Sequence, residues 1–80
     1  TASGGPFLKL KESKFKKLAE SRVNKAIDTI KLVGNLSNTN NYAYTEDQAR
    51  KLLLALEGQI KNTRALFMAE LAKSNKTFKL

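Results

Sequence analysis

The segment GNLSNTNNYAYTEDQ (residues 34–48) contains neither Lys nor Arg, although the 80-residue chain has fifteen of them distributed on both sides of it. Its Asn side chains compete with the helical backbone for hydrogen bonds and favour turns. Its last four residues match a capping box, in which Thr45 and Gln48 bond to each other's backbone N–H groups, and the two acidic residues after Thr45 complement the helix dipole. We therefore predict an Asn-rich loop of about ten residues, longer than most helix-to-helix connections, and a helix that begins at Thr45.

Two amphipathic stripes flank this loop. The downstream stripe consists of Ala49, Leu52, Leu53, Leu56, Ile60, Thr63, Phe67 and Leu71. The upstream stripe consists of Phe15, Leu18, Ala19, Val23, Ala26, Ile30 and Val33. Apolar residues at three- and four-residue steps are typical of one face of a helix. We predict one helix from near Ser13 to Gly34, where Gly permits the left-handed conformation of a helix cap, and a second that extends to near Lys73.

The two ends of the chain have different patterns. Residues 1–6 (TASGGP) are small residues, Gly and Pro, which favour a flexible arm. Residues 7–11 (FLKLK) alternate apolar and basic side chains from Leu8 onward, and residues 77–80 (TFKL) are similar, a pattern typical of short strands. The sequence thus predicts a flexible or strand-like basic arm at 1–12, a helical domain at 13–73 and a basic tail at 74–80.

The predicted fold is all-α. Two long helices joined by one loop pack most simply as an antiparallel hairpin, so that the stripes bury each other and Phe15 lies near Phe67. Residues 1–31 hold eight basic and three acidic residues (+5), residues 32–49 hold none and two (−2), and residues 50–80 hold seven and two (+5). The hairpin would bring both basic thirds together, and the strand-like ends would be able to pair.

Composition excludes several classes of chemistry. The chain has no His and no Cys, so it lacks the usual proton shuttle at neutral pH, the thiol nucleophile and the commonest zinc ligands. Most of its seven carboxylates have a Lys or Arg neighbour on the same helix, and no Gly-rich phosphate loop is present. We predict a protein that is not an enzyme, with no metal, cofactor or small-molecule substrate. No apolar run approaches the roughly 20 residues of a membrane span, and the absence of Cys favours a cytoplasmic location.

The basic residues are the main functional candidates. A net charge of +8 attracts polyanions, and Lys makes phosphate contacts that do not depend on base sequence. We predict binding to nucleic acid, either DNA or RNA, through a basic face. The residues assigned to it are Lys9, Lys11, Lys14, Lys16, Lys17, Lys61, Arg64, Lys73 and Lys76. Arg22, at the edge of its stripe, is instead expected to pair with Glu57 within the hairpin.

A second face of the downstream helix carries small or apolar residues away from its main stripe: Leu54, Gly58, Ala65 and Met68. Gly in a helix interior costs about 0.5–1 kcal/mol relative to Ala, so Gly58 favours a site of close packing. We predict that this face mediates self-association into a helical bundle. Two alternatives stay open: a protein-interaction module without a nucleic-acid role, and a cationic peptide at a membrane surface.

The order of a basic alternating segment (FLKLK), a helix, a loop and a second helix resembles ribbon-helix-helix DNA-binding proteins. That resemblance implies an N-terminal strand and binding to DNA. The helices predicted here are longer than those of such proteins, and an Asn-rich loop takes the place of their short turn. No residue role is therefore transferred from that family.

Overall fold

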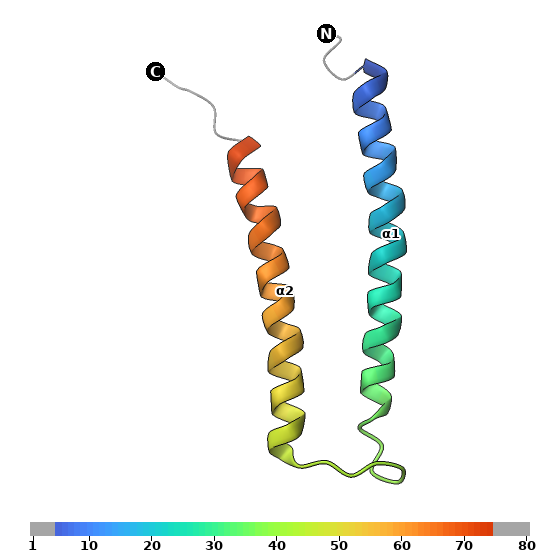
Figure 1. Cartoon of the computed structure of the whole chain (residues 1–80), viewed down its shortest axis with the longest axis vertical. Helices are drawn as coiled ribbons and strands as arrows, with labels where there is room; N and C mark the ends of the chain where they lie inside the picture. Colours follow the sequence, from blue (N-terminus) through green and yellow to red (C-terminus); the bar gives the residue numbers. More distant parts are fainter. Residues whose placement is uncertain (1–4, 75–80) are drawn as a thin grey trace. The chain divides into compact units, whose positions relative to one another are not determined.

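The computed structural model describes the backbone of residues 5–74 and the side chains of residues 8–73. Two helices account for most of it: α1, Gly5–Asn35, and α2, Glu46–Ser74 (Figure 1). The chain divides into two units, Thr1–Tyr42 and Ala43–Leu80, and each unit contains one helix. Residues 5–74 contain no strand, so the prediction of an all-helical protein is confirmed.

The first helix begins at Gly5, eight residues before the predicted start at Ser13. The strand predicted from Leu8 to Lys11 is therefore wrong, and so is the resemblance to a ribbon-helix-helix protein that depended on it. The alternation covers too few residues to define a period, whereas Leu8 lies seven residues before Phe15 and continues the helical stripe. Pro6 falls in the first turn, where its missing N–H has no helical partner to lose. The strand-like segment 77–80 lies outside the described residues.

The end of α1 also differs from the prediction. Gly34 remains within the helix and does not adopt the left-handed conformation, so the predicted cap at this residue is wrong. The chain leaves the helix through successive bonds to the third residue back. Leu36 N donates to Val33 O at 3.0 Å and Ser37 N donates to Gly34 O at 3.0 Å. This tightening pairs the last carbonyls of α1 without a left-handed residue.

Asn38 organises the connection between the two helices. Its carbonyl oxygen accepts hydrogen bonds from Asn41 N at 3.1 Å and from Tyr42 N at 3.0 Å. Its side-chain Oδ1 accepts a third bond, from Asn40 N at 2.9 Å. Asn side chains form such turns readily. The Asn38 side chain therefore satisfies one backbone donor of the connection, and the backbone carbonyl of Asn38 satisfies two more.

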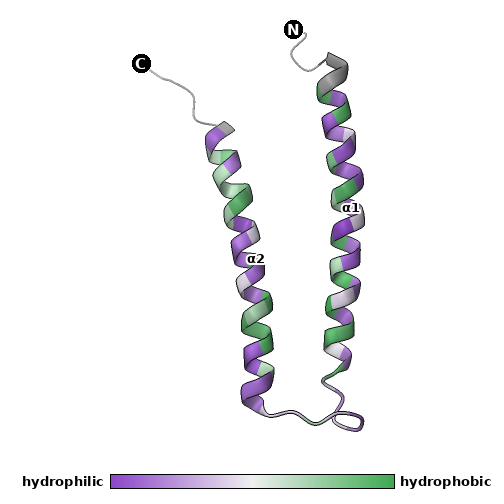
Figure 2. Ribbon diagram, viewed as in Figure 1, coloured by the Kyte–Doolittle hydropathy of each residue, from purple (hydrophilic) through white to green (hydrophobic). Residues whose placement is uncertain are grey.

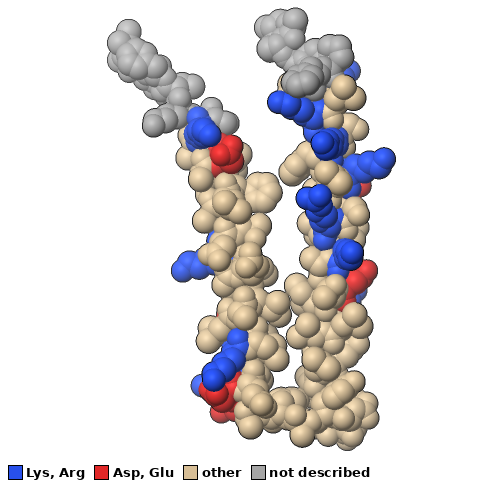
Figure 3. All heavy atoms as spheres, in the orientation of Figure 1, with Lys and Arg blue, Asp and Glu red and all other residues tan. Residues whose placement is uncertain are grey.

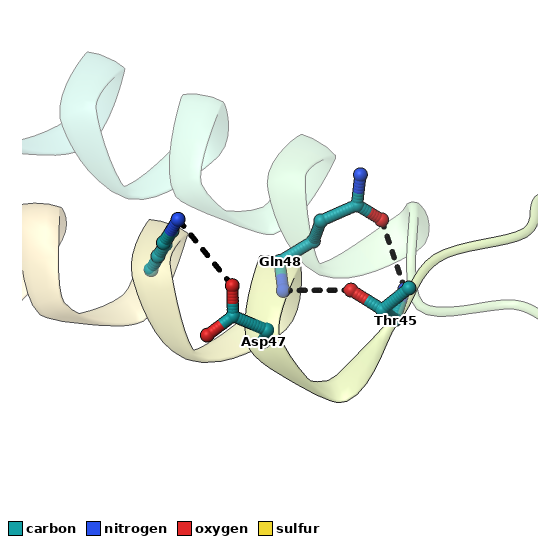
Figure 4. A network of polar contacts seen from close by, with 4 residues as sticks. Thr45, Asp47 and Gln48 are labelled. Carbon is teal, nitrogen blue, oxygen red and sulfur yellow. Dashed lines mark hydrogen bonds and ion pairs between the residues drawn. The ribbon is translucent and has the colours of Figure 1, made fainter.

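The predicted capping box at the start of α2 is confirmed. Gln48 N donates to Thr45 Oγ1 at 3.0 Å, and Thr45 N donates to Gln48 Oε1 at 2.9 Å (Figure 4). The first helical bond runs from Ala49 N to Thr45 O at 3.0 Å. Glu46 and Asp47 occupy the first turn and Lys73 the last, so the charges at both ends complement the helix dipole.

Most apolar side chains of both helices are exposed. No side chain among residues 8–73 is buried; Val33 and Leu56 are half-buried, and the exposed large apolar side chains range from Leu18 at 37% to Leu66 at 69%. Figure 2 shows apolar residues at intervals along the coloured part of each helix. A single helix cannot enclose a core by itself, so each unit presents its stripe for packing against another surface. Within the described residues, neither helix contains a stretch long and apolar enough to cross a membrane.

Candidate functional site

The residues predicted to bind nucleic acid lie on both helices. Five of them are on the N-terminal half of α1: Lys9, Lys11, Lys14, Lys16 and Lys17. Three are on α2: Lys61, Arg64 and Lys73. Lys76 lies outside the described residues. The structure brings predicted residues together only within each helix, and the convergence of the two basic sets stays a prediction.

Charge is distributed very unequally between the helices. α1 carries eight basic and three acidic residues (+5), whereas α2 carries five basic and four acidic residues (+1). The connecting residues 36–45 carry no charged side chain. Figure 3 shows Lys and Arg side chains gathered over the N-terminal half of α1. The neutral middle of the sequence therefore leaves α1 as the main source of positive potential in the described part of the chain.

Three carboxylates of α2 form ion pairs with cations of the same helix. Glu46 pairs with Arg50 and Asp47 pairs with Lys51, both at 3.3 Å, and Glu70 pairs with Lys73 at 3.6 Å. The first two pairs join oppositely charged residues four positions apart, a spacing that favours such pairs on a helix. Their side chains are roughly three-quarters exposed, so each pair contributes little to stability. Their effect is to neutralise much of the positive charge of α2 locally.

Four cations of α1 share one face of that helix: Lys11, Lys14, Arg22 and Lys25. At 3.6 residues per turn, all four lie within about 40° of the direction of Leu18, which is at the centre of the face. The carboxylates of α1, at Glu12, Glu20 and Asp28, lie about 80° or more from that direction. All four cations are exposed. We call this set the cation strip.

The strip differs from the predicted set of five lysines. Lys9 and Lys16 lie about 160–180° from Leu18 and Lys17 lies about 100° from it, so helical geometry divides that set. The predicted set did not include Lys25, and the predicted pair of Arg22 with Glu57 stays a prediction. The spacing of these cations from Lys11 and Lys14 would have identified them, had residues 7–11 been assigned to the helix.

A shallow hollow lies beside the strip, lined by Lys11, Glu12, Phe15 and Lys16. The Phe15 ring is 58% exposed there. The hollow is open to solvent, and the Glu12 carboxylate at its edge opposes binding of an anion. It is therefore part of the amphipathic surface of α1 rather than a pocket for a small molecule.

The predicted self-association residues do share one face of α2. Leu54, Gly58, Ala65 and Met68 lie within about 40° of one direction, roughly opposite the main stripe of that helix. Leu54 is 66% exposed and Met68 is 55% exposed, and a Cβ added at Gly58 would meet open space. Lys61 lies on the same face, between Gly58 and Ala65. The predicted nucleic-acid and self-association residues therefore overlap at Lys61.

The described residues contain no group of His, Cys, Asp and Glu side chains that could hold a metal ion. The carboxylates are spread along both helices, as the sequence indicates. Comparison with models of known protein families, with curated proteins and with solved structures finds no match to this chain.

Proposed function

We propose that this protein is a non-enzymatic nucleic-acid-binding protein that contacts phosphates mainly through the basic residues of α1. The observation that carries the proposal is the excess of eight basic over three acidic residues on this one exposed helix. Lys and Arg at this density attract polyanions and exchange condensed counterions for phosphate contacts. On α2, Lys61, Arg64 and Lys73 add to the field, and Lys76 extends it beyond the described residues.

The exposed stripes support a second part of the proposal. α1 and α2 each present a row of apolar side chains, and their helical lengths, 31 and 29 residues, are closely matched. An antiparallel hairpin would bury both rows against each other, with Leu56 facing α1. Most of the α1 stripe lies about 60–140° from the direction of Leu18, so the cation strip would border the packed pair, with Leu18 at the edge shared by the two.

A titration against salt tests the nucleic-acid function. The test measures the fluorescence anisotropy of labelled duplex DNA, single-stranded DNA and RNA of equal length between about 50 and 200 mM salt. Each phosphate contact contributes about −0.9 to the slope of log affinity against log salt for duplex DNA. We expect a slope of about −4 or steeper, reflecting the four strip cations and the basic residues around them. Absence of binding, or an affinity independent of salt, would contradict the function.

The second candidate function is a protein-interaction module that uses the Leu54 face of α2. Exposure of Leu54 and Met68 favours it. Lys61 opposes self-association through this face, because two copies would bring like charges together. Sedimentation of the wild type and of a Leu54→Lys variant separates the two functions. A dimer lost in the variant with nucleic-acid affinity unchanged would assign association and binding to different faces.

Binding to a membrane surface is the weaker reading of α1. Basic residues flank its apolar stripe on both sides, which suits an interfacial helix. Glu12, however, lies within the stripe, close in angle to Ile30 and Ala19. Insertion of the stripe into lipid would have to bury or neutralise this carboxylate. A hydrated phosphate backbone beside the strip imposes no such cost.

A further inference from the structure

The cation strip consists of two pairs with the same internal spacing. Lys11 and Lys14 form the first pair, Arg22 and Lys25 form the second, and each member of the second follows its counterpart by eleven residues. Eleven residues complete about three helical turns, which returns the second pair to the face of the first. The pairs are therefore in rotational register, and their midpoints lie about 16 Å apart along α1.

The gap between the pairs matches a dimension of duplex DNA. Lys14 and Arg22 are eight residues apart, which corresponds to about 12 Å along the helix axis. The major groove of B-form DNA is about 12 Å wide and is bordered by phosphates of both strands. A helix lying across the groove could place one cation pair on each bordering strand. The gap between the two pairs, which is centred on the edge residue Leu18, would lie over the groove.

Other polyanions fit this spacing less well. A-form RNA has a narrow, deep major groove that does not admit a helix, so the same contact across a major groove is not available there. A single strand has no second row of phosphates for the other pair. An anionic membrane has no fixed phosphate spacing, and the Glu12 carboxylate within the apolar stripe opposes insertion.

We infer that α1 binds double-stranded DNA by spanning the major groove, with Lys11 and Lys14 on one phosphate strand and Arg22 and Lys25 on the other. The inference rests on the proposed nucleic-acid function and specifies its ligand and its contacts. The contacts are to phosphates, so they position the helix without selecting a base sequence.

Two variants that conserve net charge test the inference in the full chain. The first moves the second pair off the face: Arg22→Gln and Lys25→Gln are combined with Ser13→Lys and Asn24→Lys, which lie more than about 110° from Leu18. The second variant keeps the second cation pair on the same face of α1 but lengthens the gap between the two pairs. It combines the same two Gln substitutions with Thr29→Arg and Leu32→Lys, which place the second pair about 10 Å farther along the helix. Ser13→Gln with Asn24→Gln is the matched control. Circular dichroism checks that helicity is retained.

Affinity is measured by anisotropy for a labelled duplex of about 20 base pairs, for one of its strands and for duplex RNA of the same length. We expect the wild type to bind duplex DNA at least about tenfold more tightly than the other two ligands. Both relocated variants should lose at least about tenfold for duplex DNA, and the salt slope should fall by about 2. The control should stay within about twofold of the wild type.

The possible failures are distinguishable. Duplex affinity unchanged in the off-face variant would show that the strip is not the site. A loss in that variant but not in the spacing variant would place the strip on DNA while contradicting the groove-spanning geometry. Equal or tighter binding to single strands or to duplex RNA would overturn the choice of ligand and leave the nucleic-acid function intact. Binding to none of these three ligands would overturn both proposals.

Discussion

The two helices have similar lengths but differ in their end residues and in their net charge. α2 opens with a reciprocal capping box, has acidic residues in its first turn and a basic one in its last, and is nearly neutral. α1 has no acidic residue in its first turn and no basic residue in its last, ends without a left-handed cap, and carries +5. The end residues of α2 stabilise it as a helix. α1 lacks such end signals, and its excess of like charges produces repulsion along the helix. The difference in charge is the basis for proposing α1, rather than α2, as the helix that binds nucleic acid.

Removing the strip should have the largest effect. Replacing Lys11, Lys14, Arg22 and Lys25 with Gln removes about four phosphate contacts, which lowers affinity for duplex DNA about a thousandfold near 100 mM salt, or about 4 kcal/mol. The matched variant replaces four cations of α2, namely Arg50, Lys51, Lys61 and Arg64, and should lose about tenfold or less because two of them are already paired. Anisotropy titrations measure both. Equal losses would remove the distinction between the helices.

The proposed packing of the stripes gives the next effect. If the stripes pack as proposed, Leu56→Ala should destabilise the fold by about 3 kcal/mol, because it would leave a cavity in the packed interface. Leu66→Ala removes the same atoms from a side chain that is 69% exposed and off the stripe, so it should cost less than about 0.5 kcal/mol. Urea unfolding followed by circular dichroism compares the two. Similar effects at both positions would argue against a stripe that packs.

The capping box should be worth less than the packing. Thr45→Ala removes the acceptor for Gln48 N and should reduce the free energy of unfolding by about 1 kcal/mol. Thr45→Ser retains the hydroxyl and should restore most of the loss. The same urea experiment measures both variants. A Thr45→Ala variant as stable as the wild type would mean that the capping box does not contribute to the stability of α2.

The smallest expected effect is a gain. Gly58→Ala should raise stability by about 0.5–1 kcal/mol, since the added Cβ meets open space and Ala favours the helix. Thermal unfolding at several protein concentrations measures it. A loss of stability that grows with protein concentration would instead show that a second helix packs closely at Gly58, as self-association through this face requires.

The parts of the fold that the sequence could predict are those determined by neighbouring residues. Thr45 and Gln48 determine the start of α2 between themselves, and the ion pairs of Glu46 and Asp47 follow from four-residue spacing. Residues 7–11 were assigned wrongly because a short alternation of apolar and basic residues is compatible with either a strand or a helix. That error also concealed the strip, since Lys11 has a defined angle relative to Lys14 only once both belong to the same helix. The packing of one stripe on the other depends on both helices together, and it stays a prediction.

The most direct test of the account is an amide chemical-shift titration of the labelled full chain with a 20-base-pair duplex. If α1 is the binding helix, shift changes should concentrate between Lys9 and Ile27, and amides at the start of α2, from Glu46 to Leu56, should change little. Changes centred on α2, or changes of similar size in both helices, would contradict the assignment of binding to the cation strip.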